Sequence, residues 1–243
     1  MTDWSAYLAG YHEERPGITE DLLSLAHSAG VTPYAWAAEA VPSSARVLDV
    51  CCGSAPLGPL VRSERYLGVD LSLAELARAS AQGLTVARAD AARLPVITAA
   101  VDCVVMSMAL QLVPFAVSLD EIARVLRPGG TVVVIVPASR PLSPADRLRY
   151  GRLAVALRST LSYPNDDQLD GFAGTPDLRV VSDESRAFVV SVDTDARADL
   201  LLEALYLPGV SEERLAAGRR VVRTWVGKQV AVPIRRLVLV SRA

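Results

Sequence analysis

Three aspartates, each at or just after the end of a short apolar run, are spaced so that they could hold a nucleoside. Asp49 is followed by a turn of small residues over 51–55, and small residues let backbone amides approach a ligand closely. Asp70 lies 21 residues after Asp49 at the end of the next apolar run, and Asp90 follows the third. An acidic residue about 20 positions beyond such a turn is well placed to accept hydrogen bonds from ribose hydroxyls. The spacing predicts a ribose site, although dinucleotides and other nucleoside cofactors share this device.

A second group of chemistry-bearing side chains lies near the N-terminus. Tyr11, His12, Glu13 and Arg15 fall within five residues, just before a Pro-Gly pair that breaks the chain. Histidine is the commonest general base in enzymes, and the sequence holds two. We therefore take His12 as the first candidate base, with Glu13 or Glu20 behind it. The alternative is that these are surface charges around a helix start, and the sequence leaves both interpretations open.

Short apolar runs alternate with helix-like stretches through the middle of the chain, and these elements must position the aspartates. Five runs have the composition of strands that are buried on both faces: Arg46–Val50, Tyr66–Asp70, Leu84–Arg88, Val101–Met106 and Thr131–Val136. Over Val117–Leu126, apolar residues recur at i, i+3, i+4 and i+7, which predicts an amphipathic helix. This alternation favours an α/β, Rossmann-like, doubly wound and mostly parallel sheet, in which ligands bind at the carboxyl ends of the strands.

The flanking regions predict two units, a helical cap or lid over residues 1–42 and a core over 43–243 that includes C-terminal, substrate-facing elements. In the cap we expect a helix capped by Thr19. After residue 137 we expect a helix over 144–157, a polar loop over 163–175, a strand near 188–192, one or two helices over 197–225, and a strand over 230–240. Pro233 argues against one unbroken central strand in the last of these.

Composition excludes several classes of function. The net charge is -2 and the sequence pI is about 5.8, so there is no basic footprint for nucleic acid. No apolar stretch is long enough for a transmembrane helix and no secretory signal is recognisable, which favours a cytoplasmic protein that does not bind membranes. The three cysteines lack metal-ligand or disulfide spacing. We therefore expect a metal-independent protein whose partner is a small molecule, and which is a monomer or homodimer.

Five segments, in this order, resemble the motifs of class I S-adenosylmethionine-dependent methyltransferases, small-molecule branch. Val47–Pro56 resembles the first motif, usually Asp/Glu-x-Gly-x-Gly-x-Gly. The segments Tyr66–Ser72, Ala89–Pro95, Val101–Gln111 and Leu119–Gly130 resemble, in turn, the ribose motif, the adenine motif, the strand that passes the methionine, and the helix leading to the fifth strand.

The resemblance implies a seven-stranded sheet with an N-terminal helical lid, S-adenosylmethionine as cofactor and S-adenosylhomocysteine as product. It implies these cofactor-binding residues: Tyr11, Arg15, Asp49, Cys51, Gly53, Asp70, Leu71, Asp90, Ala91 and Met106. For the substrate it implies Tyr7, Met108 and Gln111, and we assign catalysis to His12 and Glu13. The aromatic, apolar flanks suggest a small, largely apolar organic acceptor, as in specialised metabolism.

Three positions depart from the family pattern. Cys51 and Ala55 stand where the family has its first and third loop glycines, and Gln111 stands where many members of this branch have histidine. A Cβ atom at a position of positive φ costs energy. Two alternatives to methyl transfer therefore stay open: an enzyme that uses the bound cofactor to promote cyclisation or rearrangement, and a non-catalytic binding protein.

Overall fold

A seven-stranded sheet forms the centre of the protein in the computed structural model, which describes residues 3–43, 45–63 and 65–242. The strand order is β3-β2-β1-β4-β5-β7-β6. β7 runs antiparallel to both of its neighbours, and the other neighbouring pairs are parallel. The strands are β1 Val47–Val50, β2 Tyr66–Asp70, β3 Val86–Arg88, β4 Val101–Ser107, β5 Leu126–Pro137, β6 Leu178–Val192 and β7 Lys228–Ser241. The predicted Rossmann-like, mostly parallel α/β sheet is thus confirmed.

Helices cover both faces of the sheet because successive strand residues point to opposite sides. On one face Leu48 belongs to the same apolar cluster as Ile122 of α5. On the other, Val47 clusters with Trp36 of α3 and Leu153 of α6. The helices are α1 Trp4–Glu14, α2 Ile18–Leu23, α3 Pro33–Ala38, α4 Leu73–Ala81, α5 Phe115–Val125, α6 Pro144–Leu157, α7 Asp166–Leu169, α8 Asp195–Glu203 and α9 Glu212–Arg223.

The last strand differs from the sequence prediction. β7 runs without a break through Pro233, although proline cannot donate a ladder hydrogen bond. The ladder between β5 and β7 ends at the pair Pro137 and Ile234, whereas Pro233 is paired with Ala187 of β6. Proline is tolerated here because Pro233 lies just before the part of β7 that pairs with β5: its carbonyl accepts from the Ala138 N–H, and its nitrogen meets no β5 ladder position. The partner strand β6 is correspondingly longer than the predicted run near 188–192.

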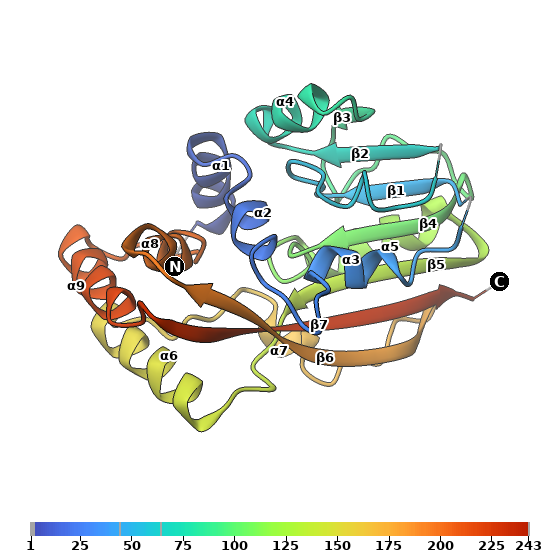
Figure 1. Cartoon of the computed structure of the whole chain (residues 1–243). Helices are drawn as coiled ribbons and strands as arrows, with labels where there is room; N and C mark the ends of the chain where they lie inside the picture. Colours follow the sequence, from blue (N-terminus) through green and yellow to red (C-terminus); the bar gives the residue numbers. More distant parts are fainter. Residues whose placement is uncertain (1–2, 44, 64, 243) are drawn as a thin grey trace.

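The parallel strands point toward α1 and α2, which lie beyond their carboxyl ends (Figure 1). The N-terminal segment is helical as predicted, but α2 begins at Ile18 with Gly17, not Thr19, as its N-cap. Gly17 adopts a φ of 79°, in the left-handed region, which a glycine reaches at little cost. Among the described residues, none of the helices has the length and hydropathy needed to cross a bilayer.

Candidate functional site

The loop after β1 is held in a left-handed conformation at three alternate positions. Cys51, Gly53 and Ala55 have φ values of 55°, 55° and 59°. These are the positions that the resemblance assigns to glycine, so the backbone keeps a glycine-type course although two of its residues carry a Cβ atom. Left-handed geometry costs an L-residue roughly 1–2 kcal/mol. The rest of the fold therefore imposes this loop on Cys51 and Ala55.

Asp70 ties this loop to the end of β2. Its Oδ2 accepts a hydrogen bond of 2.9 Å from the backbone N–H of Gly53, and its Oδ1 accepts one of 2.9 Å from that of Ser72. Burial raises the pKa of the Asp70 carboxyl, and these two backbone donors oppose that effect. The carboxylate predicted to meet a ribose thus also fixes the loop that would lie beneath the cofactor.

Asp49 is the most deeply buried carboxyl group beside the loop, with 1% of its surface exposed. Its Oδ2 accepts a hydrogen bond of 2.7 Å from the hydroxyl of Tyr66. Its Oδ1 is buried and has no hydrogen-bond partner among the described residues. Burial raises the pKa of Asp49 to about 7; the hydrogen bond from Tyr66 opposes this, and the charge of Asp70 reinforces it. A buried carboxyl with a free oxygen is suited to bind a cation.

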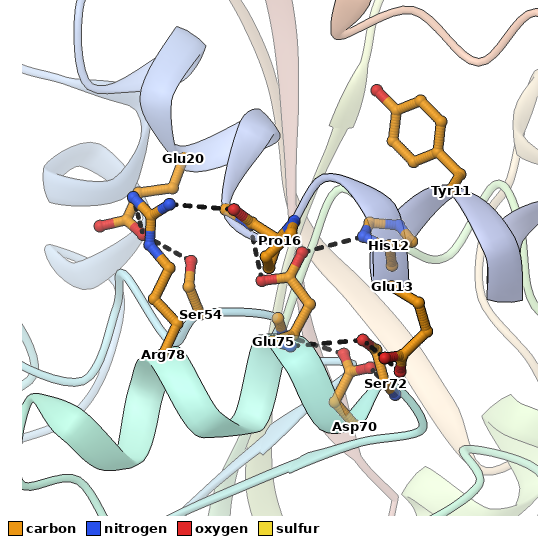
Figure 2. A network of polar contacts seen from close by, with 12 residues as sticks. Tyr11, His12, Glu13, Pro16, Glu20, Ser54, Asp70, Ser72, Glu75 and Arg78 are labelled. Carbon is orange, nitrogen blue, oxygen red and sulfur yellow. Dashed lines mark hydrogen bonds and ion pairs between the residues drawn. The ribbon is translucent and has the colours of Figure 1, made fainter.

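Glu75, on α4, joins the N-terminal segment to this region. Only 3% of the residue is exposed. Its Oε1 lies 2.9 Å from Nδ1 of His12, and its Oε2 accepts a hydrogen bond of 2.9 Å from the backbone N–H of Gly17 (Figure 2). The other ring nitrogen of His12, Nε2, lies 3.3 Å from the hydroxyl of Tyr206. The imidazole therefore spans the distance between α4 and the C-terminal part of the chain.

Further polar contacts surround this pair. Glu13 Oε1 accepts hydrogen bonds from the Ser72 hydroxyl at 3.0 Å and from the Leu73 backbone N–H at 2.8 Å, at the start of α4 (Figure 2). A carboxylate is favourable at a helix N-terminus, and the bond from Ser72 is the main cause that lowers the pKa of Glu13. The structure thus places Glu13 in a contact between the two segments, and His12 beside a buried carboxylate.

Arg78 makes the second connection between α4 and the N-terminal segment. Its guanidinium donates to the backbone oxygen of Pro16 at 2.9 Å and to Oδ1 of Asp21 at 2.6 Å. It also crosses Gly17 so closely that a Cβ atom there would collide with it. The Ser54 hydroxyl, from the loop after β1, donates to Glu20. The loop after β1, α4 and the segment around α2 are therefore in mutual contact.

The site is rich in carboxylates. Asp49, Asp70, Glu20 and Glu75 lie at or over the loop and Glu13 lies at the start of α4, and together they favour a positively charged ligand. The Cys51 thiol, within the loop, does not favour the reactive thiolate form. Burial and the charges of Asp70 and Asp49 raise its pKa well above its ordinary value. Within the described part of the chain, no three His, Cys, Asp or Glu side chains are grouped as metal ligands.

Three of the predicted N-terminal residues, Tyr7, Tyr11 and Arg15, point away from the loop after β1. Tyr7 and Tyr11 share a face of α1 and contact the C-terminal part: the Tyr7 hydroxyl accepts from the Leu207 backbone N–H at 2.8 Å, and the Tyr11 hydroxyl donates to the Glu203 backbone oxygen at 2.6 Å. Arg15 lies over the Tyr11 ring, 5.4 Å from its centre. These side chains line a cleft of about 450 Å³ between α1 and the α8–α9 segment. Tyr11 and Arg15 therefore face this cleft and not the loop. Tyr11 precedes His12 directly, and successive helix residues point about 100° apart, so the two side chains leave α1 in different directions.

The remaining predicted residues lie along the carboxyl edge of the sheet. Leu71 is 54% exposed beside Asp70, whereas Ala91 and Met106 are buried. Asp90 is exposed, and its Oδ1 accepts from the Ala92 backbone N–H.

Met108 and Gln111 follow the end of β4. Gln111 is fully buried, and its Nε2 donates to the backbone oxygen of Met108 at 2.7 Å. Its Oε1 has no hydrogen-bond partner within the described ranges. A buried free acceptor of this kind can receive a donor group from a bound molecule.

Sequence reasoning missed Glu75, Arg78, Ser72 and Tyr206. One signal for Glu75 was present: it falls on the same helical stripe as Ser72 and the buried residues Leu76 and Ala79. A charged residue on an apolar stripe is unusual. Its partner in the N-terminal segment, by contrast, could not be read from spacing.

Residues 48–134 match the family model of the methyltransferase domain. Residues 48–134, which include the loop after β1, Asp70 and β4, therefore have the sequence pattern of a methyltransferase domain. A comparison of the sequence with curated proteins gave no match. Solved structures of low sequence identity, by contrast, resemble the chain in fold.

Three of these solved structures illustrate the range. A possible histamine N-methyltransferase from Thermotoga maritima matches with a TM-score of 0.54 and 15% identity, over 97% of this chain and 100% of that one. The cyclase SpnF matches with a TM-score of 0.53 and 20% identity, over 86% of this chain and 80% of that one. Phosphoethanolamine N-methyltransferase 2 of Haemonchus contortus, in complex with phosphomonomethylethanolamine and S-adenosylhomocysteine, matches with a TM-score of 0.57 and 16% identity, over 100% of this chain and 61% of that one. Identities this low establish a shared fold alone.

Proposed function

We propose that this protein transfers a methyl group from S-adenosylmethionine to a small, largely apolar organic acceptor in specialised metabolism. One observation carries the proposal. Within the matched region, the left-handed loop at Cys51–Ala55 is joined by Asp70 to the end of β2, at the carboxyl edge of a parallel sheet. That edge is where this class of sheet binds its ligands.

The residues at this edge fit S-adenosylmethionine, which carries positive charge on its sulfonium and its ammonium group. Asp49 supplies a buried carboxyl oxygen with no partner among the described residues, and Asp70, at the end of β2, supplies the carboxylate that we assign to the ribose. The exposed Leu71 and the neighbours Asp90 and Ala91 are assigned to the adenine, and Met106 to the floor of the site. The surrounding carboxylates disfavour an anionic cofactor.

The bound cofactor supplies a methyl group that is already activated by the sulfonium. The chain then has to align an acceptor, exclude water and accept a proton where the acceptor loses one. His12 is the base we assign to that proton, because its ring contacts Glu75, whose carboxylate lies over the loop. Met108 and Gln111 are assigned to the acceptor, Tyr7 joins α1 to the C-terminal part of the chain, and α1 and α2 act as the lid. Glu13 and the pair Tyr11 and Arg15 are then lid contacts.

Calorimetric titration with S-adenosylmethionine and S-adenosylhomocysteine, followed by mass spectrometry of candidate acceptors, tests the proposal. We expect both nucleosides to bind in the micromolar range and an acceptor to gain one methyl group. Binding with a rearranged but unmethylated product would instead support the cyclisation alternative. Absence of binding by either nucleoside would support the non-catalytic alternative.

A further inference from the structure

Glu75 is a buried carboxylate whose two oxygens are both directed at the N-terminal segment. Oε1 meets Nδ1 of His12 and Oε2 meets the backbone N–H of Gly17, each at 2.9 Å. The carboxylate also lies over the cofactor loop, since a Cβ atom added to Gly53 would be 3.6 Å from Oε2. A buried carboxylate is costly unless its oxygens are satisfied, and these two contacts satisfy them.

These contacts determine where the proton of the His12 ring resides. A carboxylate can only accept hydrogen bonds, so the nitrogen that faces it, Nδ1, must carry a hydrogen. In the neutral ring Nε2 then has a lone pair, and it faces the hydroxyl of Tyr206 at 3.3 Å. Burial raises the pKa of Tyr206, so that hydroxyl stays protonated and can donate a hydrogen bond to the Nε2 lone pair.

We propose that Glu75 is a positioning residue that fixes His12 in the Nδ1–H tautomer and so presents Nε2 as the proton acceptor. This inference rests on the proposed function, in which His12 is the base. A proton lost by an acceptor hydroxyl, amine or thiol passes to the Tyr206 oxygen as the Tyr206 hydroxyl proton moves to Nε2, and the imidazolium that results is stabilised by the adjacent Glu75 carboxylate. A histidine oriented by a carboxylate is the arrangement that makes imidazole an effective base.

The variant Glu75→Gln should change the tautomer of His12 while keeping the shape of the site, because glutamine has nearly the same size as glutamate. The Gly17 N–H needs an acceptor, so the amide oxygen is expected to take the Oε2 position. The amide NH₂ then faces Nδ1 of His12 and donates to it, which shifts the ring hydrogen to Nε2. The matched control is Asp21→Asn, which removes another carboxylate charge between the same two segments, at the contact with Arg78.

The first readout is the tautomer itself, measured by long-range ¹H–¹⁵N correlation of histidine side chains about two pH units above the usual histidine pKa. The chain has two histidines, so the exposed His27 serves as an internal reference. We expect Nδ1–H for His12 in the wild type and in Asp21→Asn, and Nε2–H in Glu75→Gln. An Nε2–H ring in the wild type, or an unchanged ring in Glu75→Gln, would overturn the inference.

The second readout separates this inference from the proposed function. We expect Glu75→Gln to lower kcat by about 10²–10⁴-fold, with its affinity for S-adenosylhomocysteine within about threefold of the wild type. A switched tautomer with wild-type kcat would overturn the positioning role. A wild type that makes no methylated product would refute the proposed function instead, while the spectra would still decide whether Glu75 sets the tautomer.

Discussion

The two sides of the candidate site are held by different means. The cofactor side, from Asp49 to Asp70, is held by strands in register and by one carboxylate that accepts from backbone amides. The lid side is held by side chains that reach across long sequence separations: His12 and Gly17 to Glu75, and Pro16 to Arg78. The first arrangement resists change because the sheet fixes it. The second depends on side-chain contacts between helices, so we expect it to open more readily than the sheet, as a segment that admits ligands would.

The largest expected effect concerns chemistry on the lid side. We expect His12→Ala to lower kcat by about 10²–10⁴-fold, because the base is lost, while cofactor affinity stays within about threefold. Steady-state kinetics and calorimetry on the same preparation measure both. His27→Ala, at the exposed second histidine, is the control and should keep wild-type kcat. Equal turnover in the His12 and His27 variants would make His12 a docking residue only.

The cofactor side should show the reverse pattern, with loss of affinity as the primary defect. Asp70→Ala removes the charged acceptor of the Gly53 amide and of the expected ribose. Hydrogen bonds to charged groups contribute about 1.5–3 kcal/mol, so the Kd for S-adenosylhomocysteine should rise by roughly 10–150-fold. Asp183→Ala, at an exposed ion pair with Arg235, should bind normally. Unchanged affinity in Asp70→Ala would place the ribose elsewhere.

The buried Asp49 predicts a pH dependence of cofactor binding. Its pKa is raised from 3.8 to about 7 in the folded chain, so the native state holds a proton that the unfolded state has lost between these values. The free energy of unfolding should therefore fall as the pH rises from about 4 to about 7. A cationic ligand favours the charged carboxylate, so affinity should rise by up to about tenfold per pH unit below pH 7 and then level off.

Calorimetry between pH 5.5 and 7.5 measures this dependence, and Asp49→Asn is the matched variant. The asparagine keeps an oxygen for the Tyr66 hydroxyl but cannot ionise. We expect weaker binding with a flattened pH profile. A profile as steep as that of the wild type would assign the dependence to another group.

The sequence predicted the cofactor side far better than the lid side. Asp49 and Asp70 could be found because strand, turn and strand follow one another locally, and the fold class followed from the same alternation. His12 could be named as a candidate, but its partners Glu75 and Tyr206 lie 63 and 194 residues away. Such pairings depend on how the segments pack, and no local pattern encodes them.

Two details show how tertiary structure overrides local preference. Pro233 would normally end a strand, yet it lies within β7 at a point that β5 no longer reaches. Thr19 is a good capping residue by type, but Gly17 occupies the N-cap position because its amide is taken up by Glu75 and its Cα is crossed by Arg78. In both cases a distant element decided the outcome.

A smaller effect is expected from loosening the lid. Arg78→Ala removes the hydrogen bonds to Pro16 and Asp21. Bonds of this kind contribute about 1–2 kcal/mol together, so opening of the N-terminal segment should become roughly 5–30 times more frequent. Hydrogen exchange should then quicken over residues 12–23, with exchange in β1 and β4 unchanged. Arg147→Ala, at an exposed position on α6, is the control, and equal exchange in both variants would show that Arg78 does not hold the lid.

The smallest effect tests whether the backbone alone holds the cofactor side. Cys51→Gly relieves left-handed strain of roughly 1–2 kcal/mol but gains unfolded-state entropy worth about 0.4–1 kcal/mol. We therefore expect a net gain in the free energy of unfolding of about 0.5–1 kcal/mol, measured by denaturant titration. Gly53→Ala, at the neighbouring left-handed position, should lose stability by a similar amount. If Cys51→Gly also lost stability, packing of the half-buried Cys51 side chain would outweigh the strain, and the loop, like the lid, would be held by its side chains.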